Sequence, residues 1–386
     1  MKTPVSIVSI ASVSALGHNR DQIITNYGLA KHFLSKQSFF DKEVVVGALT
    51  PDTKTAMATL SHSDKKYKSL DNTVLFAIHT AREVLEKSGW DREATIGVNF
   101  GSSRGATALF EKQYAFFLEH QKSEVLTSPT TTLGNISSWV SHDLQIDGPD
   151  VSHSITCSTA LHALLNGMAW LQAGFADKFI VGGSEAPLTD FTLSQIHALK
   201  IYTENIENPF PCRALDMDQT QNSMVLGEGA AAVGLELGVS DKALALIEGI
   251  GYATEILSHA ASLSATAECL QKSMRMALRN MAPSDVDVIV MHAPGTLKGD
   301  VAEMRAIEAV FYKDIPALTT NKWKLGHTFG ASGLLSLEMA VIMLQTQTFI
   351  EVPYLNNHSR PKKIKRILVN AVGFGGNAVS VMLRLP

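Results

Sequence analysis

The sequence predicts an α/β protein built from two halves of similar order. Short apolar runs alternate with amphipathic stretches along all 386 residues, which is typical of strands alternating with helices. A more polar stretch at residues 236–242 divides the chain, and strands and helices follow in a similar order on each side of it. Apolar residues make up 45% of the sequence, which is enough for two packed cores.

The predicted strands are apolar runs that are long enough for buried strands and too short for most helices. They begin with a first strand after residue 5 and continue at residues 96–100, 150–156, 179–182, 230–235, 244–249, 288–291 and 367–372. Predicted helices carry apolar residues at three- and four-residue spacing. They lie at residues 70–88, 158–173, 302–312 and 334–344.

Composition restricts the classes of function. The start of the chain is interrupted by serines, which favours a buried first strand over a signal peptide. We find no apolar run of about 18 residues and therefore expect no membrane span. Three cysteines and a net charge of −4 indicate a protein of the reducing cytoplasm with no general attraction to nucleic acid.

Cys157 lies between a predicted strand and a predicted helix that ends near Gly174. Unpaired amide hydrogens at the start of a helix stabilise a thiolate, so we expect a pKa below that of a free thiol. The same amides could hold an oxyanion. A lone cysteine is more often a small core residue. We assign that role to Cys212 and Cys269, which have no partner motif.

Two histidines lie in glycine-rich segments downstream. His292 ends a predicted strand and precedes a turn, and His327 follows Gly326 ahead of an apolar helix. Either histidine alone is more often structural. Two neutral imidazoles donating from Nε2 could stabilise the enolate formed when a malonyl thioester loses carbon dioxide. Together with Cys157, the pair predicts carbon–carbon bond formation from a decarboxylating thioester.

These motifs resemble those of the β-ketoacyl-acyl-carrier-protein synthases. The resemblance runs nearly end to end, through Gly182-Gly183-Ser184-Glu185 and Gly227-Glu228-Gly229 to Gly373-Phe374-Gly375-Gly376-Asn377. It implies a duplicated, five-layered αβαβα fold of the thiolase type. Residues 1–238 would be the half that carries the cysteine, and residues 239–386 the half that carries both histidines. The active site would lie between the halves, and members are usually dimers.

The resemblance also implies a role for each residue of the central motifs. Cys157 would be the acyl-accepting nucleophile, and His292 and His327 the pair of the decarboxylation site. Lys322 would be the active-site lysine.

Four further residues take supporting roles from the resemblance. Asp300 and Glu303 would organise the lysine and nearby water, and Thr296 would bind the phosphopantetheine arm. Phe374 would be the gatekeeper, and its amide would form the oxyanion hole with the amide of Cys157.

Some positions differ from the family pattern. Pro294 stands where a second pantetheine-binding threonine is usual, and Ser336 stands where a glutamate is usual. Glu338 lies about 200° further round the helix and is not expected to replace that glutamate. Residues 213–228 form a longer segment without the usual Arg-Asp-Gly. These differences indicate a divergent branch of the family, such as one serving aryl-polyene or flexirubin-type pathways.

Lys65, Lys66 and Lys68 match by position the basic patch that condensing enzymes offer to an acidic carrier protein. A positive patch can steer an anionic partner. The simpler interpretation is a solvated helix start, and residues 360–366 form a second basic cluster that charge alone does not exclude.

The resulting hypothesis is a decarboxylating condensing enzyme that needs no metal and no cofactor beyond the phosphopantetheine of its acyl carrier protein. A thiolase would need a second reactive cysteine near the C-terminus, and the last cysteine is Cys269. A non-catalytic chain-length partner subunit stays as the alternative. The sequence leaves the homodimer and the heterodimer with a related subunit both open.

Overall fold

The computed structural model describes residues 3–91, 93–133, 135–256, 263–355 and 360–386. One half contributes five strands, β1 (Val5–Val13), β4 (Ile96–Gly101), β5 (Asp150–His153), β6 (Lys178–Glu185) and β7 (Gly229–Leu237). The other contributes β8 (Ala245–Thr254), β9 (Val288–Val290), β10 (Ala317–Thr319), β11 (Arg366–Gly373) and β12 (Asn377–Arg384). A separate hairpin consists of β2 (Ser35–Phe39) and β3 (Lys42–Val46).

The two halves have the same strand order. It runs β5-β4-β6-β7-β1 in the first and β10-β9-β11-β12-β8 in the second. In each half the three strands at the outer edge are parallel, and the remaining pairings are antiparallel. A short antiparallel contact between β1 and β8 joins the two sheets. The repeated order indicates a duplicated fold.

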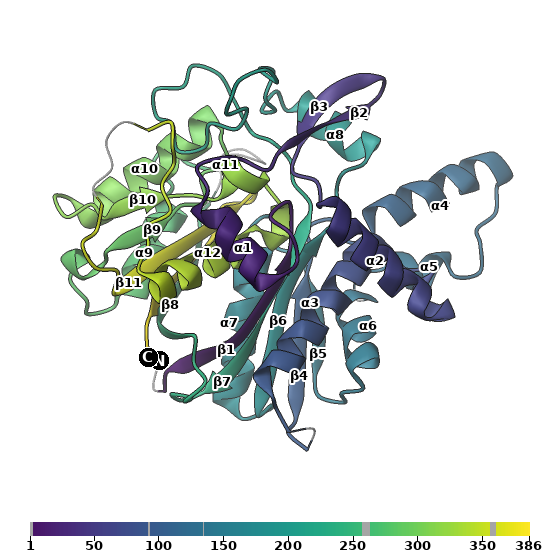
Figure 1. Ribbon diagram of the computed structural model, residues 1–386, viewed down its shortest axis with the longest axis horizontal. Coiled ribbons are helices and arrows are strands. Elements are labelled where there is room, and N and C mark those ends of the chain that lie inside the picture. Colours follow the sequence, from purple (N-terminus) through teal and green to yellow (C-terminus); the bar gives the residue numbers. More distant parts are fainter. Residues whose placement is uncertain (1–2, 92, 134, 257–262, 356–359) are drawn as a thin grey trace.

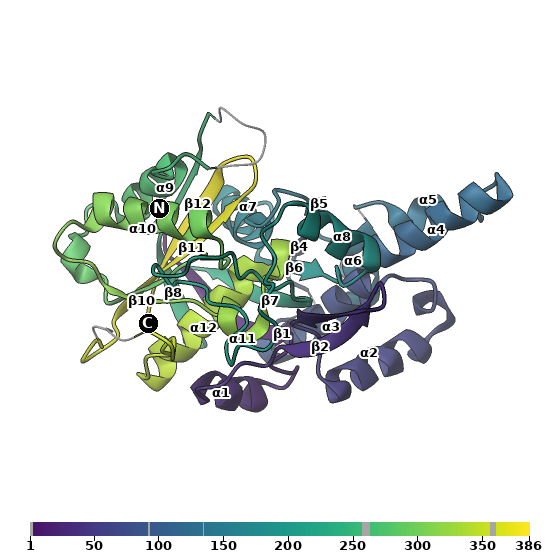
Figure 2. The same cartoon turned by 90° about the horizontal axis from the view of Figure 1, so that it is seen from above.

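Helices form three layers around the two sheets (Figures 1 and 2). The helices α7 (Thr159–Ala173) and α12 (Ser332–Thr346) pack against each other and against strands of both halves. One outer layer contains α3 (Asn72–Ser88) and α6 (Asn135–Leu144), and the other contains α9 (Glu268–Leu278) and α10 (Leu297–Phe311). This is the five-layered arrangement of the thiolase type.

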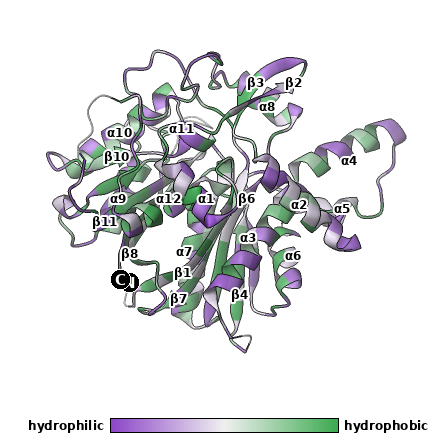
Figure 3. Ribbon diagram, in the orientation of Figure 1, coloured by the Kyte–Doolittle hydropathy of each residue, from purple (hydrophilic) through white to green (hydrophobic). Residues whose placement is uncertain are grey.

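Side-chain alternation along the strands supplies the cores between these layers. In β11, Ile367, Val369 and Ala371 face the central helices. Leu368 and Val372 face the outer helices α9 and α10. Figure 3 shows hydrophobic residues along β1 and β7, where both faces of the sheet are covered.

The remaining helices lie at the ends and edges of the layers. They are α1 (Arg20–Gly28), α2 (Pro51–Ser63), α4 (Thr107–His120), α5 (Thr127–Thr131), α8 (Asp190–Ala198) and α11 (Lys322–Leu325), with the short 3-10 turns η1 (Lys65–Tyr67), η2 (Pro283–Asp285) and η3 (Phe329–Ala331). The pair α4 and α5 forms an arm that projects from the body of the protein (Figures 1 and 2).

The predicted strands and helices coincide with observed elements, with differences at their ends. The predicted strand 150–156 ends at His153, and the predicted helix 302–312 begins earlier, at Leu297. The search of the sequence for apolar runs did not single out Phe329–Thr346, a stretch that is long and apolar enough to cross a membrane by length and composition alone. Of this stretch 89% is buried, since α12 lies between the two sheets. The division into domains at 238/239 stays a prediction.

Candidate active site

A strained turn between β5 and α7 presents Cys157. The preceding residue, Thr156, has a left-handed φ of 46°. Its hydroxyl donates to the carbonyl of Phe374 at 3.0 Å, and its carbonyl accepts from the Ser103 hydroxyl at 2.7 Å. A Cβ on Gly373 would lie 1.9 Å from Thr156 Oγ1, so glycine permits this contact. The turn is thereby anchored to both halves of the protein.

The Cys157 thiol is only 7% exposed and faces its own amide and that of Phe374. Burial, followed by the charge of Glu185, raises the pKa of Cys157 to about 12. Lys322 and the two amides lower the pKa by less. The expectation of a depressed pKa was therefore wrong, because desolvation of the thiolate outweighs the helix start.

His292 and His327 meet with ring centroids 5.1 Å apart and nearly perpendicular planes. The Nδ1 atom of His327 contacts Ser332 Oγ at 3.0 Å, which leaves its Nε2 for the site. Burial, followed by the positive charge of Lys322, lowers the pKa of His327 to about 3. Burial, followed by His327 and Lys322, holds the pKa of His292 well below its ordinary value. Both imidazoles are therefore neutral near pH 7 and can act as hydrogen-bond donors.

Lys322 lies in α11 and is 1% exposed. Its ammonium donates to Asn321 Oδ1 at 3.2 Å and to Ser336 Oγ at 3.5 Å. Burial lowers the pKa of Lys322 to about 8, although Glu303 and other acidic groups act in the opposite direction. Glu338 instead accepts from the Ser12 hydroxyl at 2.7 Å, as expected from its place on the helix.

Asp300 and Glu303 hold the main chain around His292. The Glu303 carboxylate accepts from the amides of His292 at 3.0 Å and Ala293 at 2.8 Å. Asp300 accepts from the amides of Gly295 at 3.1 Å and of Thr296 at 3.0 Å. The charges of both carboxylates act on Lys322, although its hydrogen bonds go to the neutral oxygens of Asn321 and Ser336. Their predicted role toward the lysine stays a prediction.

The segment that differs most from the family pattern supports the same turn. Ser223 donates its amide to the carbonyl of Gly295 at 2.8 Å, and Asn222 Oδ1 accepts from the amide of Leu297 at 2.9 Å. Beside it lies a cavity of about 620 Å³, lined by residues of the 203–223 stretch with Tyr354 and Leu355. Cys157 and both histidines lie outside the lining of this cavity.

The role of Glu185 was not predicted from the sequence, where this residue is only the last member of the motif Gly182-Gly183-Ser184-Glu185. Its Oε1 accepts from the amides of Ser103 and Gly330, the latter at 3.1 Å. Its Oε2 is buried without a partner among the described residues. Burial raises the pKa of Glu185 to about 7, and its charge raises the pKa of Cys157. The sequence feature that could have indicated this role is a carboxylate at the end of a glycine-rich strand.

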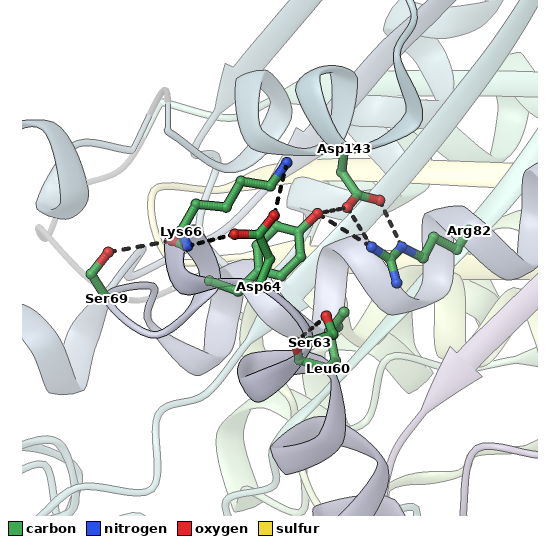
Figure 4. Close-up of polar contacts among 8 residues, drawn as sticks. Leu60, Ser63, Asp64, Lys66, Ser69, Arg82 and Asp143 are labelled. Carbon is green, nitrogen blue, oxygen red and sulfur yellow. Dashed lines mark hydrogen bonds and ion pairs between the residues drawn. The ribbon is translucent and has the colours of Figure 1, made fainter.

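The predicted carrier-protein patch comprises Lys65 and Lys66 of η1 and Lys68, which follows it, and Figure 4 shows Lys66 with its neighbours. Lys65 and Lys68 are exposed. Lys66 lies 3.8 Å from Asp64 and 5.0 Å over the ring of Tyr67, so its charge is partly engaged.

The base of this patch is anchored to the helices beneath it. The Tyr67 hydroxyl donates to Asp143 of α6, and Arg82 of α3 donates to both oxygens of the same carboxylate at 2.8 and 2.6 Å.

In the described part of the chain, no three histidine, cysteine or acidic side chains form a cluster that could hold a metal ion.

The chain matches the family model of the β-ketoacyl synthase N-terminal domain at residues 3–238 and of the C-terminal domain at residues 244–356. It therefore belongs to the β-ketoacyl synthase family, and it is a condensing enzyme of the acyltransferase type. The resemblance inferred from the motifs is confirmed.

Two curated relatives match over most of their length. The 3-oxoacyl-(acyl-carrier-protein) synthase 2 of Coxiella burnetii is 26% identical, and the match covers 99% of this chain and 98% of that one. The tetracenomycin polyketide synthase ketoacyl synthase alpha subunit of Streptomyces glaucescens is also 26% identical, over 84% and 83%. The structure of the ishigamide ketosynthase/chain length factor shares the fold, with a TM-score of 0.86 at 16% identity over 100% and 99% of the chains.

Replacing Lys322 by methionine is expected to stabilise the fold near pH 7. The folded-state pKa of about 8 lies below the ordinary value of 10.5, so the protonated lysine destabilises the fold below about pH 8. This destabilisation disappears as the pH rises from about 8 to 10.5, where Lys322 is protonated in the unfolded chain but not in the folded protein. We expect a gain of about 1–3 kcal/mol in the free energy of unfolding at neutral pH, measured by denaturant titration.

Lys324, two residues away, is the matched control for this substitution. Its ammonium donates to the carbonyls of Asn26 at 3.1 Å, Leu29, and Lys31 at 3.1 Å. Burial also lowers the pKa of Lys324 to about 8, so Lys324→Met removes a similarly destabilising charge but leaves these carbonyls without their donor, at a cost of about 1–3 kcal/mol. We therefore expect a smaller gain than for Lys322→Met, or a loss. Equal losses for the two variants would show that Lys322 is a structural residue.

Replacing Glu185 by glutamine is expected to make Cys157 more reactive. The substitution removes the negative charge that raises the pKa of the thiol above about pH 7, where Glu185 is ionised. Alkylation of Cys157 by iodoacetamide, followed by peptide mass spectrometry, should accelerate by about tenfold for each pKa unit removed. Glu228→Gln is the control, because Glu228 is also a buried carboxyl but is not among the groups that shift the pKa of Cys157, and it accepts from the Leu49 amide at 3.0 Å. Rates for Glu185→Gln that equal those of the wild type would contradict the assignment.

Proposed function

We propose that this protein catalyses the decarboxylating condensation of an acyl thioester with malonyl-acyl carrier protein. The product is a β-ketoacyl-acyl carrier protein of fatty acid, polyketide or polyene synthesis. The observation that carries the proposal is the Cys157 thiol facing two backbone amides, together with two neutral, buried imidazoles that share the charge of Lys322 with it as a neighbour.

In the first half of the reaction, Cys157 takes the acyl group from its carrier. The sulfur attacks the thioester carbonyl, and the amides of Cys157 and Phe374 hold the developing oxyanion. The carbon–sulfur bond to the carrier breaks, and the leaving thiolate receives the proton of Cys157. Because the pKa of Cys157 is raised, the thiol keeps its proton near neutral pH. The proton must therefore move to the leaving thiolate as the sulfur attacks.

In the second half, His292 and His327 receive malonyl-acyl carrier protein. Neutral Nε2–H donors can hold the thioester oxygen as carbon dioxide leaves and the enolate forms. The enolate carbon then attacks the acyl-Cys157 carbonyl, the bond to sulfur breaks, and the thiolate of Cys157 takes up a proton from solvent. Lys322 would supply positive charge to the site and Thr296 would bind the pantetheine arm.

Acyl carrier protein is the partner that this reaction requires, and the name of the Coxiella burnetii relative includes it. We place its docking site at Lys65, Lys66 and Lys68. The phosphopantetheine arrives with the carrier, so no resident cofactor is proposed. A cytoplasmic location stays an expectation.

A second subunit is the other proposed partner. The arm α4–α5 exposes Phe110, Tyr114, Phe117 and Leu118, each at least 40% accessible. The strand β5 forms the adjoining open edge of the sheet. Such a face fits a dimer partner, either an identical copy or a related ketosynthase-like subunit.

One specific observation favours the alternative function, a non-catalytic chain-length partner. Ser336 gives Lys322 a hydroxyl where the family pattern has a glutamate. The presence of Cys157, His292 and His327 in one site argues against this alternative, because such subunits typically lack the nucleophile.

Intact-mass analysis tests the proposal directly. Wild type should gain the mass of one acyl group when incubated with acyl-acyl carrier proteins, and Cys157→Ala should gain none. The accepted chain would also indicate the pathway. A folded wild type that gains no mass with any chain, alone or with a co-purified related subunit, would favour the non-catalytic alternative.

Reversal of charge at the proposed docking patch should separate carrier-bound from free substrates. The double variant Lys65→Glu, Lys66→Glu is expected to raise KM for acyl-acyl carrier protein by about threefold or more at low salt. KM for acyl-pantetheine should not change. Lys362→Glu, Lys363→Glu in the second basic cluster is the control, and equal losses with both substrates would reject the patch.

A further inference from the structure

Arg104 is a half-buried cation whose position the proposed reaction does not explain. It lies in the turn after β4, with its guanidinium 5.9 Å from the ring centre of Phe329. One terminal nitrogen donates to Gln195 Oε1 of α8. Its Nε is buried without an acceptor, and among the described residues no carboxylate lies within ion-pairing distance of it.

This cation lies beside the nucleophile. The preceding residue, Ser103, donates its hydroxyl to the carbonyl of Thr156, which directly precedes Cys157. The Phe329 ring on which Arg104 rests lies 5.5 Å from the His327 ring. Phe329 and Cys157 belong to one hydrophobic cluster. The guanidinium therefore borders the same cluster as the reactive sulfur.

The helix α8 adds further polar groups at this border. Leu193 and Ile196 of α8 pack into the cluster that contains Cys157. Thr192 and Gln195 are three residues apart and lie on one face of the helix. The Thr192 hydroxyl is buried without a partner, like the Nε of Arg104. Gln195 is the residue that contacts Arg104.

Unsatisfied polar groups at this place are costly unless a ligand binds them. A buried donor without an acceptor loses its hydrogen bonds to water and gains none in return, which destabilises the folded protein. Here a cation with a free N–H, a hydroxyl and an amide share the edge of an apolar cluster beside Cys157. An aliphatic acyl chain satisfies none of them, whereas a chain with an oxygen function can accept from Arg104 and Thr192.

We propose that Arg104, with Thr192 and Gln195, binds an oxygen function on the acyl chain carried by Cys157, and that a carboxylate binds best. This inference rests on the proposed function, since it concerns the acyl group that Cys157 accepts. Arg104 and Thr192 are then specificity-determining residues, because they contact the chain away from the reacting carbonyl. An unpaired guanidinium favours an anionic acceptor over a neutral one.

Competition between matched acyl groups tests this inference. Pantetheine thioesters of hexanoate and adipate, and of octanoate and suberate, differ only in the terminal carboxylate. Intact mass gives the rate at which each acylates Cys157. The ratio of carboxyacyl to plain acyl rates should fall by about tenfold or more in Arg104→Met. Arg275→Met, at an exposed site on the outer helix α9, should keep the wild-type ratio.

Further variants decide the outcome if Arg104→Met does not fold. Thr192→Val keeps the volume and removes only the hydroxyl, so the ratio should fall by less. Arg104→Lys should retain part of the preference for carboxylate. Acetyl-pantetheine with wild type reports separately whether Cys157 accepts acyl groups, which tests the proposed function alone. Acetylation of wild type with an unchanged ratio in the Arg104 and Thr192 variants overturns the inference.

Discussion

The packing of α7 on α12 between the two sheets determines the rest of the structure. Both helices occupy corresponding places in the repeated topology. Cys157 lies just before α7, and His327 just before α12. The contact between these helices therefore brings the two segments together from opposite halves. Neither half contains all of the predicted site residues, so the proposed chemistry requires that both sheets are formed.

The same constraint explains where the backbone is strained. Thr156, Ala293 and Phe329 have left-handed φ values of 46°, 22° and 40°, and each lies within two residues of Cys157, His292 or His327. Such conformations cost about 1–3 kcal/mol each and persist only where the surroundings hold them. The Glu303 carboxylate binds the amide of Ala293, and Ser103 binds the carbonyl of Thr156. Buried polar contacts from neighbouring elements thus fix the directions of the reactive side chains.

Local pattern predicted the elements and the nucleophile turn, but not the electrostatics. The apolar runs that became β6, β9 and β11 were visible in the sequence, as was the junction at Cys157. The direction of the pKa shift of Cys157 could not be predicted from the sequence, because burial by distant elements outweighs the effect of the local helix start. Glu185 and Arg104 were missed for the same reason. Their significance depends on partners from the turn after β4, from α8 and from η3, which meet only in the folded chain.

Two buried groups of opposite charge act on Cys157 in opposite directions. Glu185 raises the pKa of the thiol and Lys322 lowers it. Burial raises the pKa of Glu185 to about 7 and lowers that of Lys322 to about 8, so both groups titrate near neutral pH. A fall in pH removes the negative charge of Glu185, which opposes the thiolate, and a rise in pH removes the positive charge of Lys322, which favours it. The reactivity of Cys157 therefore depends on pH through its neighbours, although its own proton is held throughout the neutral range.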